Sequence, residues 1–253
     1  MGRASAILSR RRLAAFVALG AAVGAYYVWR RSLPNIPFWW DITLLVFPII
    51  PAVLALVWIF LPLWRSPSVV LLGGAVALGL VAAGCDHQGW YLAGNFAKLF
   101  APALVGWWFL RFFETEAWVV IVACLIPFVD SYSVWRGPTH HIVTHQQSVF
   151  TSLSFAFPVP AAGAARLGLP DILFFALFLA AADRFELRVP LTFALSALSF
   201  GATVVIANAF DLSGLPALPL LSVAFLLANG DLLWRRSRRQ RKAAGRASPV
   251  ADE

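Results

Sequence analysis

Residues 42–63 read ITLLVFPIIPAVLALVWIFLPL and contain no charged side chain. A helix needs about 20 apolar residues to cross the roughly 30 Å hydrocarbon core of a bilayer, so this run predicts a transmembrane helix. Other predominantly apolar stretches lie on both sides of it, at residues 13–29, 69–83, 91–113, 117–134, 171–185, 190–210 and 215–233. We therefore expect eight transmembrane helices, or nine if one N-terminal span is missed.

The composition of the whole chain agrees with a membrane protein. Hydrophobic residues make up 60% of the 253 residues and charged residues 13%. Soluble domains average about half apolar and roughly a quarter charged residues, so the apolar excess is expected to face lipid. The sequence predicts an all-α polytopic protein, integral to a lipid bilayer, with no room for a separate soluble domain and no sign of a cofactor.

The pattern of polarity divides the chain into three regions. Residues 1–113 are N-terminal transmembrane helices, and residues 114–233 form a second transmembrane region that contains a polar loop, residues 136–170. Residues 234–253 are a basic tail. No small-residue cleavage site precedes Arg30, so we expect residues 1–29 to be retained rather than removed as a signal peptide.

The basic residues indicate the orientation in the membrane. Residues 234–242 read WRRSRRQRK, and basic flanks of transmembrane helices stay on the cytoplasmic side. We therefore expect a cytoplasmic C-terminus whose charges contact anionic headgroups rather than nucleic acid, although the net charge is +8. The Ala-, Leu- and Arg-rich composition is typical of a prokaryote, which would make the bilayer a plasma membrane.

Two aspartates stand where apolar helices end or begin. Asp130 follows the apolar residues 117–129, and Asp171 starts the next apolar stretch. Ionisable groups within a span cost several kcal/mol unless they are paired, protonated or in contact with water, so each one suggests function. A helix that leaves the membrane after Asp130 and one that re-enters at Asp171 place both carboxyl groups at the same face. Asp171 after Pro170 is also an ordinary helix start.

Two facing carboxyl groups have a chemistry of their own. Like charges at close range cannot both ionise, so such a pair shares one proton. The ionised carboxylate can take a proton from water while the protonated one donates a hydrogen bond to an amide oxygen. Water would then add to the amide and give a tetrahedral diol without a covalent enzyme adduct. The sequence thus predicts Asp130 and Asp171 as catalytic residues of a peptide hydrolase.

Other ionisable groups in the apolar stretches have structural interpretations. Lys98 is expected to extend its ammonium group to the membrane interface. Asp183 is expected to pair with its neighbour Arg184.

Three separated segments resemble the presenilin and signal peptide peptidase family of intramembrane aspartyl proteases. VDSYSVWRG at 129–137 is similar to the family's Tyr-Asp segment, and LGLPDI at 167–172 to its Gly-x-Gly-Asp motif, with RFE at 184–186 similar to the end of that helix. LPALP at 215–219 contains the family's Pro-Ala-Leu motif. The segments occur in the family's order, and the resemblance covers residues 117–233.

The resemblance implies a presenilin-like helix bundle of a divergent prokaryotic member that cleaves transmembrane-helix proteins or signal peptides. It assigns Asp130 and Asp171 to catalysis. It also assigns substrate contacts to Gly168, Leu169, Pro216, Ala217 and Leu218. The chain departs from the pattern at Val129, where the family has tyrosine, and at Pro170, where it has glycine.

Two alternatives remain open from the sequence. The departures at Val129 and Pro170 also fit a relative that has lost catalysis and acts as a membrane binding protein. In the polar loop, His141 and His145 are four residues apart and His140 is adjacent, which allows a metal site. No carboxylate or cysteine completes that ligand set within the loop, so we expect no metal.

Overall fold

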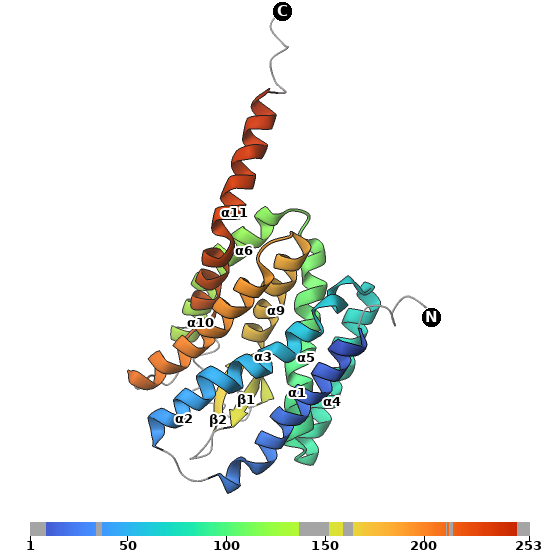
Figure 1. Ribbon diagram of the computed structural model, residues 1–253, viewed down its shortest axis with the longest axis vertical. Helices are drawn as coiled ribbons and strands as arrows, with labels where there is room; N and C mark the ends of the chain where they lie inside the picture. Colours follow the sequence, from blue (N-terminus) through green and yellow to red (C-terminus); the bar gives the residue numbers. More distant parts are fainter. Residues whose placement is uncertain are drawn as a thin grey trace, which may run out of the picture.

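The computed structural model describes residues 9–33, 37–136, 152–158, 164–210, 212 and 215–246. It is 85% helical (Figure 1). The helices of its first half are α1 (Arg10–Trp29), α2 (Phe38–Leu44), α3 (Ile50–Ile59), α4 (Ser68–Gln88), α5 (Tyr91–Phe109) and α6 (Glu116–Trp135). Those of its second half are α9 (Leu169–Arg184), α10 (Val189–Ala209) and α11 (Leu218–Arg246). Short helical turns occur at Arg30–Ser32, Leu61–Arg65 and Leu110–Phe112.

The second span is a composite helix. A π-helical turn, Leu45–Ile49, joins α2 to α3, and the N–H of Ile50 bonds to the carbonyl of Leu45 five residues earlier. Pro48 lies inside this turn. Proline has no N–H to donate and its ring crowds the preceding turn, which favours the wider hydrogen-bonding pattern.

All eight predicted stretches are helical, but they do not all have the character of a span. Within the described residues, six helices are long and apolar enough to cross a membrane, at Arg10–Trp29, Phe38–Arg65, Ser68–Gln88, Glu116–Val134, Val189–Ala209 and Leu218–Arg239. The other two are α5, which carries Asn95 and Lys98, and α9, which has only 16 residues. The prediction of a polytopic membrane protein is therefore supported, while a count of eight or nine spans is not.

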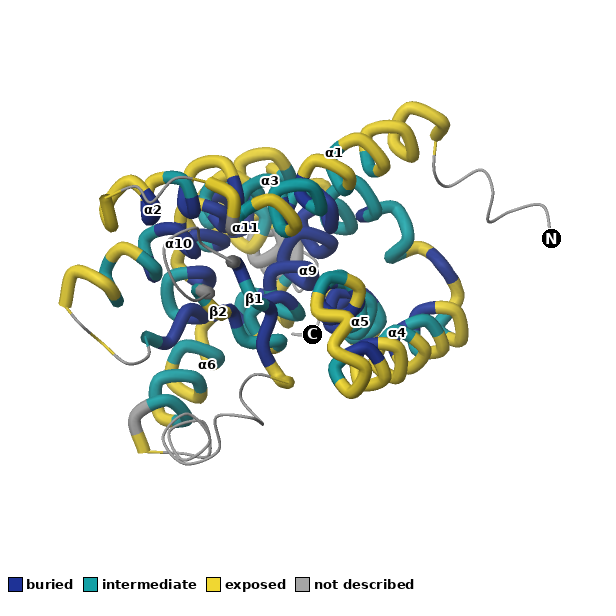
Figure 2. The backbone as a smooth tube through the Cα atoms, turned by 90° about the horizontal axis from the view of Figure 1, so that it is seen from below, coloured by how far each residue is buried: buried dark blue, intermediate teal, exposed yellow. Residues whose placement is uncertain are grey.

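Helix α9 lies at the centre of the bundle. It contacts α3, α5, α6, α10 and α11, and it is largely buried in the view of Figure 2. Its buried side chains are Ile172, Phe175, Ala176, Leu177, Phe178, Leu179, Ala180, Ala181 and Ala182. By contrast, α4 and α6 expose large apolar side chains such as Leu80 and Phe128. Exposed apolar faces of this kind are what a helix presents to lipid.

Two of the predicted regions contain regular structure that the sequence pattern did not indicate. Within the predicted loop 136–170, strands β1 (Ser154–Pro158) and β2 (Ala164–Gly168) form an antiparallel hairpin that pairs Ser154 with Gly168 and Pro158 with Ala164. Alternating Phe155, Phe157 and Leu167 are buried, which explains a strand at this position. In the other region, α11 continues without a break from the apolar region into the basic tail as far as Arg246, since arginine, lysine and alanine favour helix.

The structural roles expected for Lys98 and Asp183 are also wrong in detail. Lys98 is buried and its ammonium group lies 2.7 Å from the carboxylate of Asp86 on α4. Asp183 accepts hydrogen bonds of 2.7 Å from Trp64 and Arg65. Arg184 instead donates to the carbonyl of Leu110. Lys98 and Asp183 thus have partners on other helical segments of the bundle, which the linear sequence does not reveal.

Candidate active site

Asp130 is held by the start of another helix. It lies in the last turns of α6, and its half-buried carboxylate accepts a hydrogen bond of 3.1 Å from the backbone N–H of Leu218. Leu218 is the first residue of α11, where helical N–H groups have no partner within the helix. Asp130 therefore caps α11 through the Pro-Ala-Leu segment, residues 216–218.

Asp171 lies in the first turn of α9, and its carboxylate bonds to the residue that precedes this helix. Its Oδ2 accepts a 3.0 Å hydrogen bond from the backbone N–H of Gly168. A Cβ atom on Gly168 would lie 3.1 Å from that oxygen, so glycine allows the carboxylate to approach. The φ angle of Gly168 is −62°, which any residue can adopt, so the backbone conformation does not require glycine here. Pro170 also fits, because an N–H in the first helical turn has no intrahelical partner to lose.

The two carboxyl groups lie on helices that pack together. Helix α6 contacts both α9 and α11, and Asp130 and Asp171 are close enough for their charges to interact. Each carboxyl group uses Oδ2 for a backbone N–H, and the other oxygen makes no hydrogen bond within the described part of the chain. No lysine or arginine among the described residues forms an ion pair with either. The arrangement therefore places two carboxyl groups near each other, each with one oxygen that is free among the described residues to bond to water or an amide.

The hairpin that leads into Asp171 is fixed to the bundle by a side chain that the sequence analysis missed. Buried Asn95 on α5 donates to the carbonyl of Ala156 at 2.7 Å and accepts from its N–H at 2.9 Å. Tyr27 on α1 donates to the same carbonyl at 2.6 Å. The side-chain amide of Asn95 thus makes the two hydrogen bonds to Ala156 that a neighbouring strand would make at this edge of β1. In the sequence, the polar side chain of Asn95 within a mostly apolar stretch was the only signal of this role.

The opposite edge of the hairpin is open. Because both backbone groups of Ala156 face Asn95, its partner Arg166 on β2 directs its N–H and C=O away from β1. These groups make no hydrogen bond to any other described residue. The open edge of β2 ends at Gly168, three residues before Asp171.

The remaining predicted site residues lie around this centre. Pro216, Ala217 and Leu218 are buried, and Leu169 is half-buried with its N–H bonded to Leu153. The N–H of Leu218 is already used by Asp130, so it is not open to a substrate. His140, His141 and His145 lie outside the described residues. The described residues contain no group of three metal-ligating side chains.

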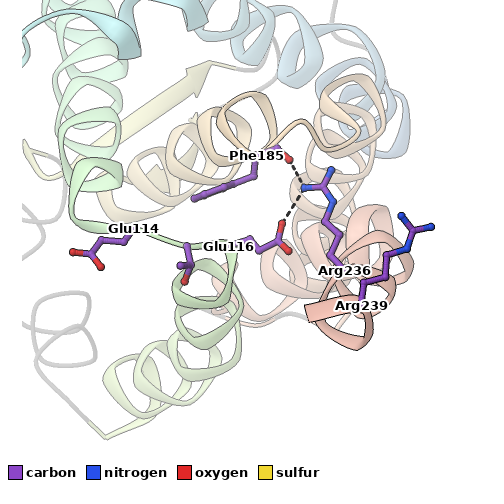
Figure 3. A pocket seen from close by; sticks show the side chains of 6 residues that line it. Glu114, Glu116, Phe185, Arg236 and Arg239 are labelled. Atoms are coloured by element: carbon purple, nitrogen blue, oxygen red, sulfur yellow. Dashed lines mark hydrogen bonds and ion pairs between the residues drawn. The ribbon is translucent and has the colours of Figure 1, made fainter. Parts of the chain in front are cut away.

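A separate hollow of about 440 Å³ lies at the opposite end of α6 (Figure 3). It is lined by Glu114, Thr115, Glu116, Phe185, Arg236 and Arg239. Arg236 bonds to the carboxylate of Glu116 at 3.0 Å and to the carbonyl of Phe185 at 2.6 Å. Fourteen residues of helix, or about 21 Å, separate Glu116 from Asp130. This charged hollow is therefore a separate site from the two aspartates.

No protein-family model matches the sequence, and comparisons with curated proteins and with solved structures give no match.

Proposed function

We propose that this protein is an intramembrane aspartyl protease, related to presenilin and signal peptide peptidase, in which Asp130 and Asp171 activate water. The observation that carries the proposal is the proximity of two carboxyl groups from different helices, near enough for their charges to interact, with no cation paired to either among the described residues. A buried carboxylate with a purely structural role is normally neutralised by a positive partner. The contact of Asp130 with Leu218 of the Pro-Ala-Leu segment adds support from a second motif.

The proposed reaction uses the pair as one unit. The ionised carboxyl group accepts a proton from water, which adds to the scissile amide, while the protonated group donates a hydrogen bond to the amide oxygen. Collapse of the diol breaks the C–N bond, and the leaving nitrogen takes up a proton. The backbone N–H groups of Gly168 and Leu218 hold one oxygen of each carboxyl group in place during these steps.

The proposed substrates are single transmembrane helices of proteins or signal peptides. A helix must unwind before its amides are accessible, and an extended segment in a membrane needs partners for its backbone groups. The open edge of β2 could provide them at Arg166, by addition of a strand next to Asp171. Gly168, Leu169, Pro216 and Ala217 remain the proposed surroundings of that segment.

The test is cleavage of a labelled transmembrane-helix peptide by the purified protein in liposomes. Asp130→Asn and Asp171→Asn keep the size and the ability to accept a hydrogen bond but cannot exchange the proton. Each is expected to lower the rate by about 10²–10⁴-fold, the usual range for loss of an acid or base. Exposed Glu114, at the far end of α6, supplies the matched control Glu114→Gln, which should cleave normally.

A chelator should leave the rate unchanged. Cleavage that depends on metal and survives both aspartate variants would instead favour a site at His141 and His145. No cleavage of several helical substrates by the wild-type protein would favour a non-enzymatic membrane binding protein.

A further inference from the structure

One face of α10 carries a line of buried hydroxyl groups. Thr192, Ser196, Ser199 and Thr203 are spaced by four, three and four residues and are all buried. At 100° per residue these positions fall within about 60° of one another, so they share one face. Phe193 and Phe200, on a neighbouring face, pack on Phe175 of α9 instead. The hydroxyl face is therefore directed to a different partner.

That partner is α11. Asn229 donates a hydrogen bond of 2.8 Å to the hydroxyl of Thr192 and so sets the register of the two helices, which run antiparallel. Ser222 lies seven residues before Asn229 and thus two turns along the same face. Ser199 lies seven residues after Thr192 on α10. The same register places Ser222 opposite Ser199, with Ser196 one turn away.

Two of the hydroxyl groups in this seam have no partner in the described part of the chain. The Oγ atoms of Ser196 and Ser222 make no hydrogen bond to any described residue, although their residues are only 0% and 1% exposed. The hydroxyls of Ser199 and Thr203, in contrast, bond to carbonyls of the preceding turn on α10. Buried hydroxyl groups without a partner are unfavourable, and ordered water is what normally satisfies them.

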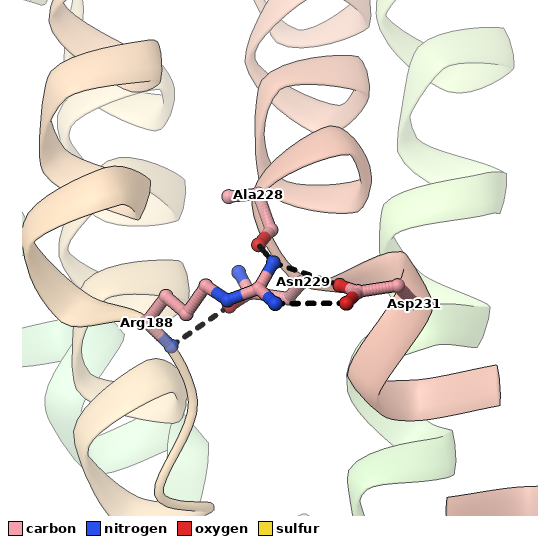
Figure 4. A network of polar contacts seen from close by, with 4 residues as sticks. All are labelled: Arg188, Ala228, Asn229 and Asp231. Carbon is pink, nitrogen blue, oxygen red and sulfur yellow. Dashed lines mark hydrogen bonds and ion pairs between the residues drawn. The ribbon is translucent and has the colours of Figure 1, made fainter. Parts of the chain in front are cut away.

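The seam has a polar group at each end. At one end, Arg188 forms a two-point ion pair with Asp231, with both distances 2.8 Å, and its backbone N–H donates to Asn229 (Figure 4). At the other end lies Leu218, which is on the same face of α11 as Ser222 and whose N–H contacts Asp130. The hydroxyl line thus lies between a solvent-exposed ion pair at one end and a candidate catalytic carboxylate at the other.

We propose that the seam between α10 and α11 binds water at Ser196 and Ser222 and leads it from the Arg188–Asp231 end to Asp130. The supply role rests on the proposed hydrolysis, whereas water binding does not. Two hydroxyls, with the lone pairs of Ser199, provide the two to four hydrogen-bond partners that a buried water needs. Close packing alone would be served better by alanine, which leaves no polar atom unsatisfied.

The test is X-ray radiolytic labelling of the purified protein, with oxidised residues identified by mass spectrometry. Radicals formed from bound water oxidise the side chains next to it even where bulk solvent cannot enter. Phe225 is fully buried one turn from Ser222 and stacks on Phe178, and Phe175 is equally buried against Phe193 and Phe200; Phe225 should be oxidised several-fold faster than Phe175 because of the proposed water. The double variant Ser196→Ala/Ser222→Ala should lower oxidation of Phe225 to the level of Phe175.

The control variant Leu198→Ala/Val223→Ala changes exposed side chains on the same two helices and should label like wild type. Equal labelling of Phe225 and Phe175 in wild type, or labelling that persists in the double serine variant, would overturn the water site. Cleavage of the transmembrane peptide is measured with the same proteins. The double serine variant should show a severalfold lower kcat with unchanged KM.

Loss of labelling without any change in kcat would overturn the supply role. A wild-type protein that is labelled at Phe225 but cleaves nothing would contradict the proposed protease and leave the water site supported.

Discussion

Two regions of this bundle, one at Lys98 and Asp86 and the other at Asp130 and Asp171, treat neighbouring ionisable groups in different ways. Lys98 on α5 and Asp86 on α4 form an ion pair of 2.7 Å, with the lysine side chain only 8% exposed. Asp130 and Asp171 bring like charges together and bond only to backbone N–H groups among the described residues. Opposite charges stabilise each other in a low dielectric, whereas like charges there can relax only by sharing a proton. The first pair therefore has the character of a structural contact and the second that of a reactive site.

The largest expected effect on stability is loss of the ion pair. Lys98→Met leaves the half-buried carboxylate of Asp86 without its cation and should destabilise the protein by about 2–3 kcal/mol, toward the lower end for a broken buried ion pair because Asp86 keeps some contact with solvent. Thermal unfolding in detergent, followed by tryptophan fluorescence, measures the change. The double variant Lys98→Met/Asp86→Asn removes the uncompensated charge and should recover much of the loss. An unchanged midpoint in Lys98→Met would show that the pair does not hold α4 to α5.

A smaller effect is expected from the hairpin anchor. Asn95→Leu removes both side-chain bonds to Ala156 and leaves its N–H without that acceptor, while Tyr27 still donates to the carbonyl, so we expect a cost of about 2 kcal/mol. Hydrogen exchange at residues 154–158 should accelerate in this variant before the bundle itself opens. Equal protection of β1 in wild type and variant would contradict the anchoring role.

Gly168→Ala separates site geometry from stability. The added Cβ would lie 3.1 Å from Oδ2 of Asp171, so the carboxylate has to shift by a few tenths of an ångström. We expect about a tenfold loss of cleavage, because small displacements of a catalytic group are costly, while the unfolding midpoint changes little. Gly84→Ala on α4, where an added Cβ meets nothing within 4 Å, is the same substitution away from Asp171 and should cleave normally.

The smallest effect on stability should come from the aspartates. Asp130→Asn or Asp171→Asn removes repulsion between the carboxyl groups and keeps an acceptor for the backbone N–H, so the stability should change by less than about 1 kcal/mol or increase. Thermal unfolding again provides the measurement. Destabilisation as large as that of Lys98→Met would show that the two pairs are not different in kind.

Much of this architecture could be predicted from local sequence. The run at residues 42–63 and its counterparts predict helices because apolar length alone decides what can cross a bilayer. The positions of Asp130 in the last turns of α6 and of Asp171 in the first turn of α9 also agree with the ends of the apolar stretches. The hairpin at residues 154–168 was missed, because two short strands are defined by the bonds between them and by Asn95, 61 residues away from Ala156.

Only the tertiary structure decided which polar groups are partners. The sequence placed Lys98 near an interface and Asp183 beside Arg184, but packing paired them with Asp86 and Arg65. It also buried α9, although its composition resembles that of the lipid-facing helices. Helix periodicity and apolar length are local properties that each segment carries by itself. Partner choice depends on the register and rotation of packed helices, which arise only when the whole bundle forms.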